Sequence, residues 1–96
     1  MYLLDTSIVP YDPEAYRFKT ISDFKDSMRY GAEVVIEWKG QEYGIWSENG
    51  TIRVTCSSTP NESRIFDTAD DALDYMLGSD RLQDVITQVT VLDRTI

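Results

Sequence analysis

The chain has 96 residues, and its 17 aspartates and glutamates against 9 lysines and arginines give a formal net charge of −8 at pH 7. It contains no histidine and a single cysteine, Cys56, which excludes imidazole proton shuttles, histidine-activated nucleophiles, imidazole metal ligands and an internal disulfide. With 42% hydrophobic residues, the composition predicts one folded domain that binds a partner without catalysis, and with neither metal nor cofactor.

Residues 1–19 are predicted to form an N-terminal arm, and residues 20–96 a single domain. Pro10 and Pro13 exclude a continuous helix in the arm, so its apolar run is expected to be extended. The first residues lack the basic region of a secretory signal, and no apolar run approaches the roughly 20 residues of a membrane helix. We therefore expect a cytoplasmic protein.

The next part of the chain predicts one helix and three strands. A capping box at Thr20-x-x-Asp23, followed by apolar residues at helical spacing, predicts a helix over residues 21–30. Apolar residues then alternate, with tight turns at Lys39-Gly40 and Asn49-Gly50. This pattern predicts an antiparallel β-meander with strands at residues 33–38, 41–47 and 52–56.

The last third of the chain predicts two helices and a strand. Residues 57–63 are polar and are expected to form a loop. A second capping box at Thr68-x-x-Asp71 predicts a helix over residues 69–77, and Ser79 is expected to cap a short third helix. A last strand is expected at residues 88–92. The predicted order is α-β-β-β-α-α-β, an α+β two-layer sandwich with helices over the meander and a core of Phe24, Trp38, Tyr43, Ile45, Val54, Leu73 and an inward Cys56.

Acidic residues concentrate between residues 62 and 84, where seven acids and two bases give a net charge of −5. Asp70 and Asp71 would interact favourably with a helix dipole, whereas Asp70 and Asp74 form a like-charged i,i+4 pair. The cluster is either a solvated face or a face that binds a basic partner. Calcium binding is disfavoured, because the Asp-x-Asp-x-Asp-Gly loop of an EF-hand is absent. The candidate residues are Glu62, Asp67, Asp70, Asp71, Asp74, Asp80 and Asp84.

A second candidate face lies on the outward side of the meander. Alternation places Trp46 opposite the core-facing residues, beside a row of acids formed by Glu33, Glu37 and Glu42. An exposed tryptophan with a polar rim is typical of an interaction hot spot. In the alternative, residues 2–9 fold across this face and cover Trp46.

The first nine residues, MYLLDTSIV, resemble the opening strand of PIN-domain ribonucleases. That resemblance implies a metal-dependent nuclease in which Asp5 helps to hold a divalent cation. Against it, Pro10 and Pro13 stand where the family has a helix. The triplet Asp5-Thr6-Ser7 also resembles the active-site triplet of aspartic proteases, but too few residues precede it to form the upstream strand of that site.

In size, charge and predicted element order, the chain is similar to small acidic phage-encoded inhibitors, including anti-CRISPR proteins that occlude the DNA channel of an RNA-guided nuclease. The stretch GSDRLQDVI at residues 78–86 also looks like the tail of small domains common in Gram-positive bacteria and their phages.

These resemblances imply a non-enzymatic inhibitor that mimics nucleic-acid charge in the host cytoplasm and binds a basic nucleic-acid-binding protein, an RNA-guided nuclease being one such target. Direct binding to nucleic acid is disfavoured by the charge. The alternative is an accessory or assembly domain whose acidity keeps it soluble.

Overall fold

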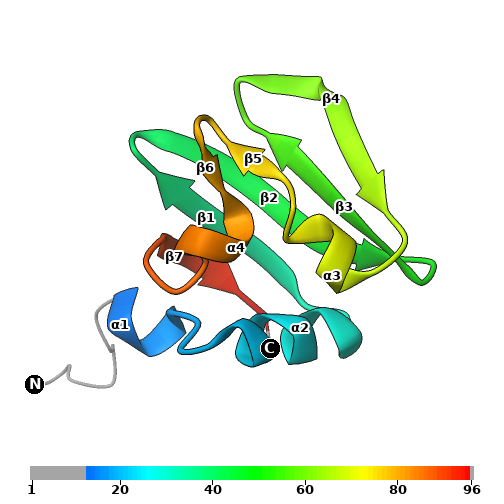
Figure 1. Ribbon diagram of the computed structural model, residues 1–96, viewed down its shortest axis with the longest axis horizontal. Coiled ribbons are helices and arrows are strands. Elements are labelled where there is room, and N and C mark those ends of the chain that lie inside the picture. The colour runs from blue at the N-terminus through cyan, green and yellow to red at the C-terminus, as the bar shows by residue number, and fades with distance from the viewer. Residues whose placement is uncertain (1–12, 96) are drawn as a thin grey trace, which may run out of the picture.

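A five-stranded antiparallel sheet is the framework of the protein (Figure 1). The computed structural model describes residues 13–95. Across the sheet the strands follow the order β4-β3-β2-β1-β7. Their bounds are β1 Glu33–Trp38, β2 Gln41–Glu48, β3 Thr51–Cys56, β4 Thr59–Phe66 and β7 Thr90–Arg94. The predicted α+β class and the three-stranded meander are confirmed.

Two-residue turns join the strands of the meander. Lys39 and Gly40 have φ of 51° and 84°, and Asn49 and Gly50 have φ of 53° and 83°. Positive φ at both central residues is the type I′ geometry, whose twist matches that of the flanking strands. These turns fix a register in which Val34 pairs with Ile45, and Ile45 pairs with Val54. The same face of all three strands therefore carries the buried apolar residues.

Within residues 13–95, four short helices and a small hairpin accompany the sheet. They are α1 Pro13–Tyr16, α2 Ile21–Arg29, α3 Ala69–Ala72 and α4 Leu82–Val85, with a hairpin formed by β5 Met76–Leu77 and β6 Asp80–Arg81. Helices α2, α3 and α4 and the hairpin lie on one side of the sheet (Figure 1). The shared core contains Phe18, Phe24, Met28, Val34, Ile36, Tyr43, Ile45, Ile52, Val54, Leu73, Leu77, Leu82, Ile86, Val89 and Val91.

The predicted loop over residues 57–63 is wrong, because most of it belongs to strand β4. This strand lies at the edge of the sheet, so only one of its sides needs backbone partners. Such a position tolerates polar side chains and Pro60, which has no N–H to donate. Its pairing with β3 shifts register between Val54 and Cys56. A polar sequence and an irregular ladder together hide an edge strand from pattern-based prediction.

The predicted helix over residues 69–77 is also wrong, because α3 ends at Ala72. The Thr68 cap is confirmed, with its hydroxyl accepting from the Asp71 N–H at 3.1 Å. After α3, two backbone carbonyls accept hydrogen bonds from the start of α4. The Leu82 N–H donates to the Tyr75 carbonyl at 2.8 Å, and the Gln83 N–H donates to the Leu73 carbonyl at 2.9 Å. These tertiary bonds replace further helical turns.

The predicted short third helix is present as α4, but its cap and the neighbouring elements differ from the predictions. Gly78, with φ of 68°, is the turn of the β5–β6 hairpin, and the N-cap of α4 is Arg81 rather than Ser79. The last strand begins at Thr90, because Gln88 and Val89 still donate their N–H groups to the carbonyl of Val85.

Part of the predicted arm is helical and packed. Residues Pro13–Tyr16 form α1, and Phe18 is completely buried. The Phe18 ring meets the Phe24 ring edge to face, with 5.4 Å between their centroids. The apolar run at residues 2–9, which is predicted to be extended, lies outside the described residues.

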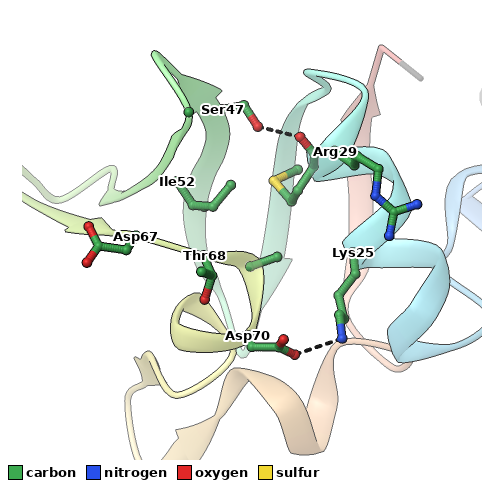
Figure 2. Close-up of a pocket in the computed structure, with 10 residues that line it drawn as sticks. Lys25, Arg29, Ser47, Ile52, Asp67, Thr68 and Asp70 are labelled. Atoms are coloured by element: carbon green, nitrogen blue, oxygen red, sulfur yellow. Dashed lines mark hydrogen bonds and ion pairs between the residues drawn. The ribbon is translucent and has the colours of Figure 1, made fainter.

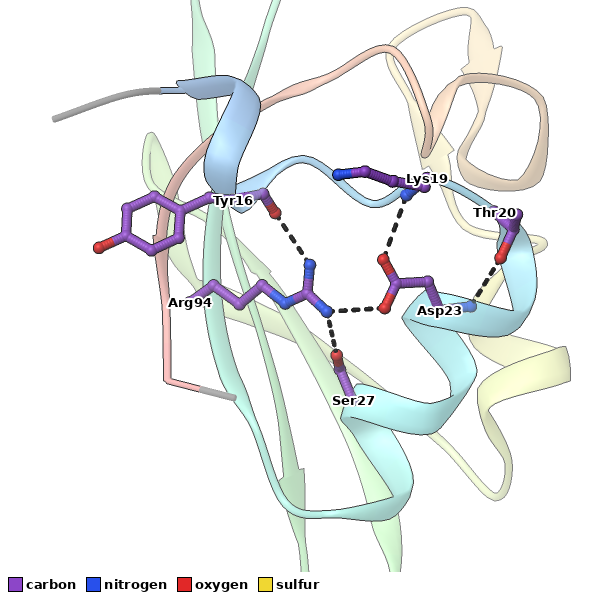
Figure 3. Close-up of polar contacts among 6 residues, drawn as sticks. All are labelled: Tyr16, Lys19, Thr20, Asp23, Ser27 and Arg94. Carbon is purple, nitrogen blue, oxygen red and sulfur yellow. Dashed lines mark hydrogen bonds and ion pairs between the residues drawn. The ribbon is translucent and has the colours of Figure 1, made fainter.

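Arg94 joins α1, α2 and β7 (Figure 3). Its side chain is 14% exposed. The guanidinium donates to the Tyr16 carbonyl at 3.0 Å, to Asp23 Oδ1 at 2.8 Å and to Ser27 Oγ at 2.9 Å. It also lies 4.2 Å from the centroid of the Phe18 ring, within the range of a cation–π interaction. One side chain thus connects the last strand to the two helices at the beginning of the described chain.

The Asp23 carboxylate makes folding dependent on pH. Burial alone would raise its pKa, but hydrogen bonds from Arg94 and from the Lys19 backbone outweigh burial and hold the pKa below 3.8. Because the pKa of Asp23 is lower in the folded state than in the unfolded state, the carboxylate stabilises the fold at pH values above its unfolded-state pKa. This stabilisation is lost as the pH falls through the folded-state pKa. As pH falls below about 4, we therefore expect the free energy of unfolding to fall more steeply in the parent than in Asp23→Asn. Urea unfolding across this range measures both slopes, and equal slopes would contradict the linkage.

Candidate partner-binding surface

The seven acidic candidates of residues 62–84 are spread over β4, α3, β6, α4 and the segments that join them. Glu62 lies on β4 and Asp74 follows α3, yet the two line the same surface hollow. Asp67 and Asp70 line a second depression, while Asp80 and Asp84 lie on β6 and α4. Asp71 is exposed on α3.

The first depression, which we call the acidic hollow, has a volume of about 380 Å³. It lies between the edge strand β4 and the segment that connects α3 to β5. Its lining residues are Thr59, Glu62, Arg64, Phe66, Asp74, Tyr75 and Met76. The Phe66 and Tyr75 rings are arranged edge to face, with 6.3 Å between their centroids. The hollow therefore combines an aromatic wall with two carboxylates.

The two carboxylates of the acidic hollow are exposed, and neither Glu62 nor Asp74 forms an ion pair with a described residue. The cation of the hollow, Arg64, lies 5.4 Å from the centroid of the Phe66 ring. Burial raises the pKa of Tyr75, and the nearby charges of Cys56 and Glu62 raise it further, against the opposing charge of Arg64. The hollow thus offers acceptors for a cation from outside the molecule.

The second depression, between α2, α3 and the β2–β3 turn, is mixed in charge (Figure 2). Its volume is about 370 Å³. Lys25 Nζ lies 2.8 Å from Asp70 Oδ1, so the predicted binding residue Asp70 is neutralised. Arg29, at the rim, pairs with Asp26 at 3.0 Å. Asp67 has no ion-pair partner among the described residues.

Asp80 connects the small hairpin to the sheet. Its Oδ2 accepts from Trp38 Nε1 at 2.9 Å and lies 2.9 Å from Lys39 Nζ. The hydrogen bond from Lys39, followed by that from Trp38, lowers the pKa of Asp80. Asp80 therefore has a structural role in attaching β6 to the β1–β2 turn. Asp84 is exposed on α4 and has no ion pair within residues 13–95.

The predicted outward position of Trp46 is confirmed. Trp46 is half-buried, and it pairs in register with the exposed Glu33 of β1. Its Nε1 donates to Glu48 Oε1 at 3.2 Å, and Arg53 Nε donates to the same oxygen at 3.1 Å. Glu37 and Glu42 also pair directly in register. The alternative in which residues 2–9 cover this face concerns residues outside the described part of the chain.

Sequence reasoning missed the residues that line the acidic hollow and the residue that accepts a hydrogen bond from Trp46. Phe66, Tyr75 and Met76 line the acidic hollow, and Glu48 accepts a hydrogen bond from the Trp46 indole. Arg53 directly follows Ile52 in the strand, so the alternation that places Trp46 outward also places Arg53 outward. The hollow could not be found this way, because it depends on β4 and on the early end of α3.

Metal binding and membrane insertion find no geometric support in the described residues. Among residues 13–95, no three cysteine, aspartate or glutamate side chains gather closely enough to hold a metal ion. Asp5, on which the nuclease and protease resemblances depend, lies outside that range. In this part of the chain, no helix combines the length and the apolar composition required to cross a membrane.

Comparison of the chain with family models, with curated protein sequences and with solved structures gave no match. Inferences about activity therefore depend on the geometry of the protein's own surface.

Proposed function

We propose that the protein is a non-enzymatic inhibitor that occupies a basic, nucleic-acid-binding surface of a target protein in the cytoplasm. An RNA-guided nuclease is one target of this kind, as in the action of anti-CRISPR proteins. The observation that carries the proposal is the acidic hollow, where Glu62 and Asp74 converge from separate elements and have no described ion-pair partner.

The hollow suits a lysine or arginine side chain of the target. Such a side chain can lay its aliphatic stem against Phe66 and Tyr75 and bring its charge between Glu62 and Asp74. Asp67, which precedes the Thr68 cap, and Asp71, within α3, are exposed and extend the negative charge beyond the hollow. With a net charge of −8, the whole molecule would attract a cationic surface, which accelerates association at low ionic strength.

A second candidate function is that of an accessory or assembly domain. It is favoured by the ion pairs of Asp70 with Lys25 and of Asp80 with Lys39, because they give two of the acids structural roles. In that case the remaining acids serve solubility, and no nucleic-acid-binding target is expected.

A charge-reversal experiment separates the two functions. The immobilised protein is exposed to a bacterial lysate, and bound proteins are displaced with duplex DNA. The rate at which the recovered target associates with the protein is then measured at increasing salt concentration. Glu62→Lys/Asp74→Lys is compared with Asp26→Lys/Asp84→Lys, a pair outside the hollow with the same change of charge. We expect the hollow pair to slow association by about tenfold at low salt, the control pair by less than about threefold, and the difference to shrink as salt rises.

Equal effects of the two pairs would show that overall charge, and not the hollow, drives association. If DNA displaces none of the retained proteins, this result would contradict nucleic-acid mimicry and favour the accessory domain.

A further inference from the structure

The side of the sheet that faces away from the helices, which we call the outer face, is not covered by any described element. Helices α2, α3 and α4 and the β5–β6 hairpin all lie on the opposite side (Figure 1). The middle strand of the sheet, β2, presents Trp46 on the outer face.

Trp46 lies over a glycine in the middle of the same strand. A Cβ atom added to Gly44 would lie 3.4 Å from Trp46 Cζ3 and 3.3 Å from Thr55 Oγ1. The other four glycines have positive φ, whereas Gly44 does not, so no turn requires glycine at this position. A glycine inside a strand often marks close approach of another group. Here that group is the indole, whose Cζ3 and Cε3 atoms lie against Gly44.

The orientation of the indole is fixed by its polar edge. Trp46 Nε1 donates to Glu48 Oε1 at 3.2 Å, and Arg53 Nε holds the same oxygen at 3.1 Å. The charge of Arg53 is thereby paired, and the indole remains partly exposed on the outer face. An aromatic ring held in this way attracts a cation placed over it.

Carboxylates flank the Trp46 platform along β1 and β2. Glu33 pairs in register with Trp46, and Glu37 pairs in register with Glu42. Glu37 Oε2 accepts from the Gly40 N–H at 2.7 Å, but none of these three glutamates forms an ion pair within the described residues. Two like charges directly opposite each other in a sheet are unfavourable, and a bound cation relieves their repulsion.

The spacing of these groups matches an extended peptide. Glu42 and Trp46 lie four residues apart on one face of β2, which corresponds to about 13 Å along a strand. In an extended partner segment, side chains at i and i+4 also share a face and lie about 13 Å apart.

We propose that the outer face is a docking surface for an extended, cationic segment of a partner protein. An arginine of this segment stacks on Trp46, and a second cation four residues away lies between Glu42 and Glu37. The surface is separate from the acidic hollow and does not depend on the function proposed above.

The probe for this proposal is a synthetic peptide, acetyl-GRGSGRG-amide, with arginines at i and i+4. The comparator, acetyl-GRRGSGG-amide, has the same composition with adjacent arginines. Both are titrated into the full-length, ¹⁵N-labelled protein while the two indole N–H resonances are followed. We expect the Trp46 indole to shift and saturate, the Trp38 indole to stay unchanged, and the i,i+4 peptide to bind about threefold tighter than the comparator.

Three variants test the platform itself. Trp46→Ala removes the ring, Gly44→Val places a side chain beneath it without changing charge, and Glu42→Gln removes one carboxylate. Each is expected to weaken peptide binding by about two- to fivefold, while Glu62→Lys/Asp74→Lys in the acidic hollow leaves the Trp46 response in place. Amide spectra confirm folding and also report peptide binding to Trp46→Ala, which lacks the indole that is followed in the parent. Glu42→Gln alone carries the test if the other two variants do not fold.

Several results would overturn the proposal. One is that both peptides bind the parent with equal affinity and bind Trp46→Ala as tightly as the parent. Another is cross-relaxation in the free protein between the Trp46 indole and residues 1–12, which would make the protein's own N-terminus the occupant. A third is concentration-dependent dimerisation that Trp46→Ala abolishes, which would make a second copy the occupant.

Discussion

Replacing Phe18 with alanine is expected to lower the free energy of unfolding by about 3–5 kcal/mol. The ring is completely buried, it packs edge to face on Phe24, and the Arg94 guanidinium lies over it. Removing the ring leaves a cavity between α2 and the segment that follows α1, and Arg94 loses its aromatic partner. Urea unfolding monitored by circular dichroism measures the loss.

Tyr30→Ala is the control for the Phe18 variant. Tyr30 is an aromatic residue at the other end of α2, and it is 66% exposed. Its truncation is expected to cost less than about 1 kcal/mol, because little apolar area is lost. If Phe18→Ala cost no more than Tyr30→Ala, residues 13–19 would behave as an arm outside the core, as the prolines of the sequence suggest.

Local sequence signals were sufficient for the first half of the fold. The capping box at Thr20 closes with a 3.0 Å hydrogen bond to the Asp23 N–H, and the Asn49-Gly50 turn adopts positive φ at both residues. These features depend on residues within four positions of each other. Period-two alternation also placed Trp46 outward, because in a strand each residue faces opposite to its neighbours.

The second half of the fold depends on contacts that local patterns do not encode. α3 ends early because the carbonyls of Leu73 and Tyr75 accept from residues 82 and 83. A longer helix would have placed Asp70 and Asp74 one turn apart on a common face, as predicted. Instead Asp70 turns to Lys25 of α2, and Asp74 lines the acidic hollow with Glu62 of β4. The grouping of the acids therefore could not be read from their spacing.

Arg94→Ala is expected to lower the free energy of unfolding by about 2–4 kcal/mol. Its guanidinium and the Asp23 carboxylate are only 14% and 32% exposed, so removing the arginine leaves a partly buried charge without its main partner. The Tyr16 carbonyl and the Ser27 hydroxyl lose a donor at the same time. Urea unfolding at neutral pH and moderate salt measures the loss.

Arg29→Ala is the matched control, because Arg29 also pairs with an aspartate, Asp26, but at exposed fractions of 66% and 52%. An exposed pair of this kind contributes less than about 1 kcal/mol. Arg94→Lys separates charge from geometry: an ammonium group can keep one partner but cannot reach Tyr16, Asp23 and Ser27 together, so we expect it to recover less than half of the loss.

The Phe18 and Arg94 variants are expected to be non-additive, because the two side chains are in contact. The double variant should be more stable than the sum of the two single losses implies, by about 0.5–2 kcal/mol. Strict additivity would mean that the guanidinium stabilises the fold only through its hydrogen bonds to α1 and α2. Losses equal for Arg94→Ala and Arg29→Ala would show that the buried position of Arg94 adds nothing to the pairing of charges.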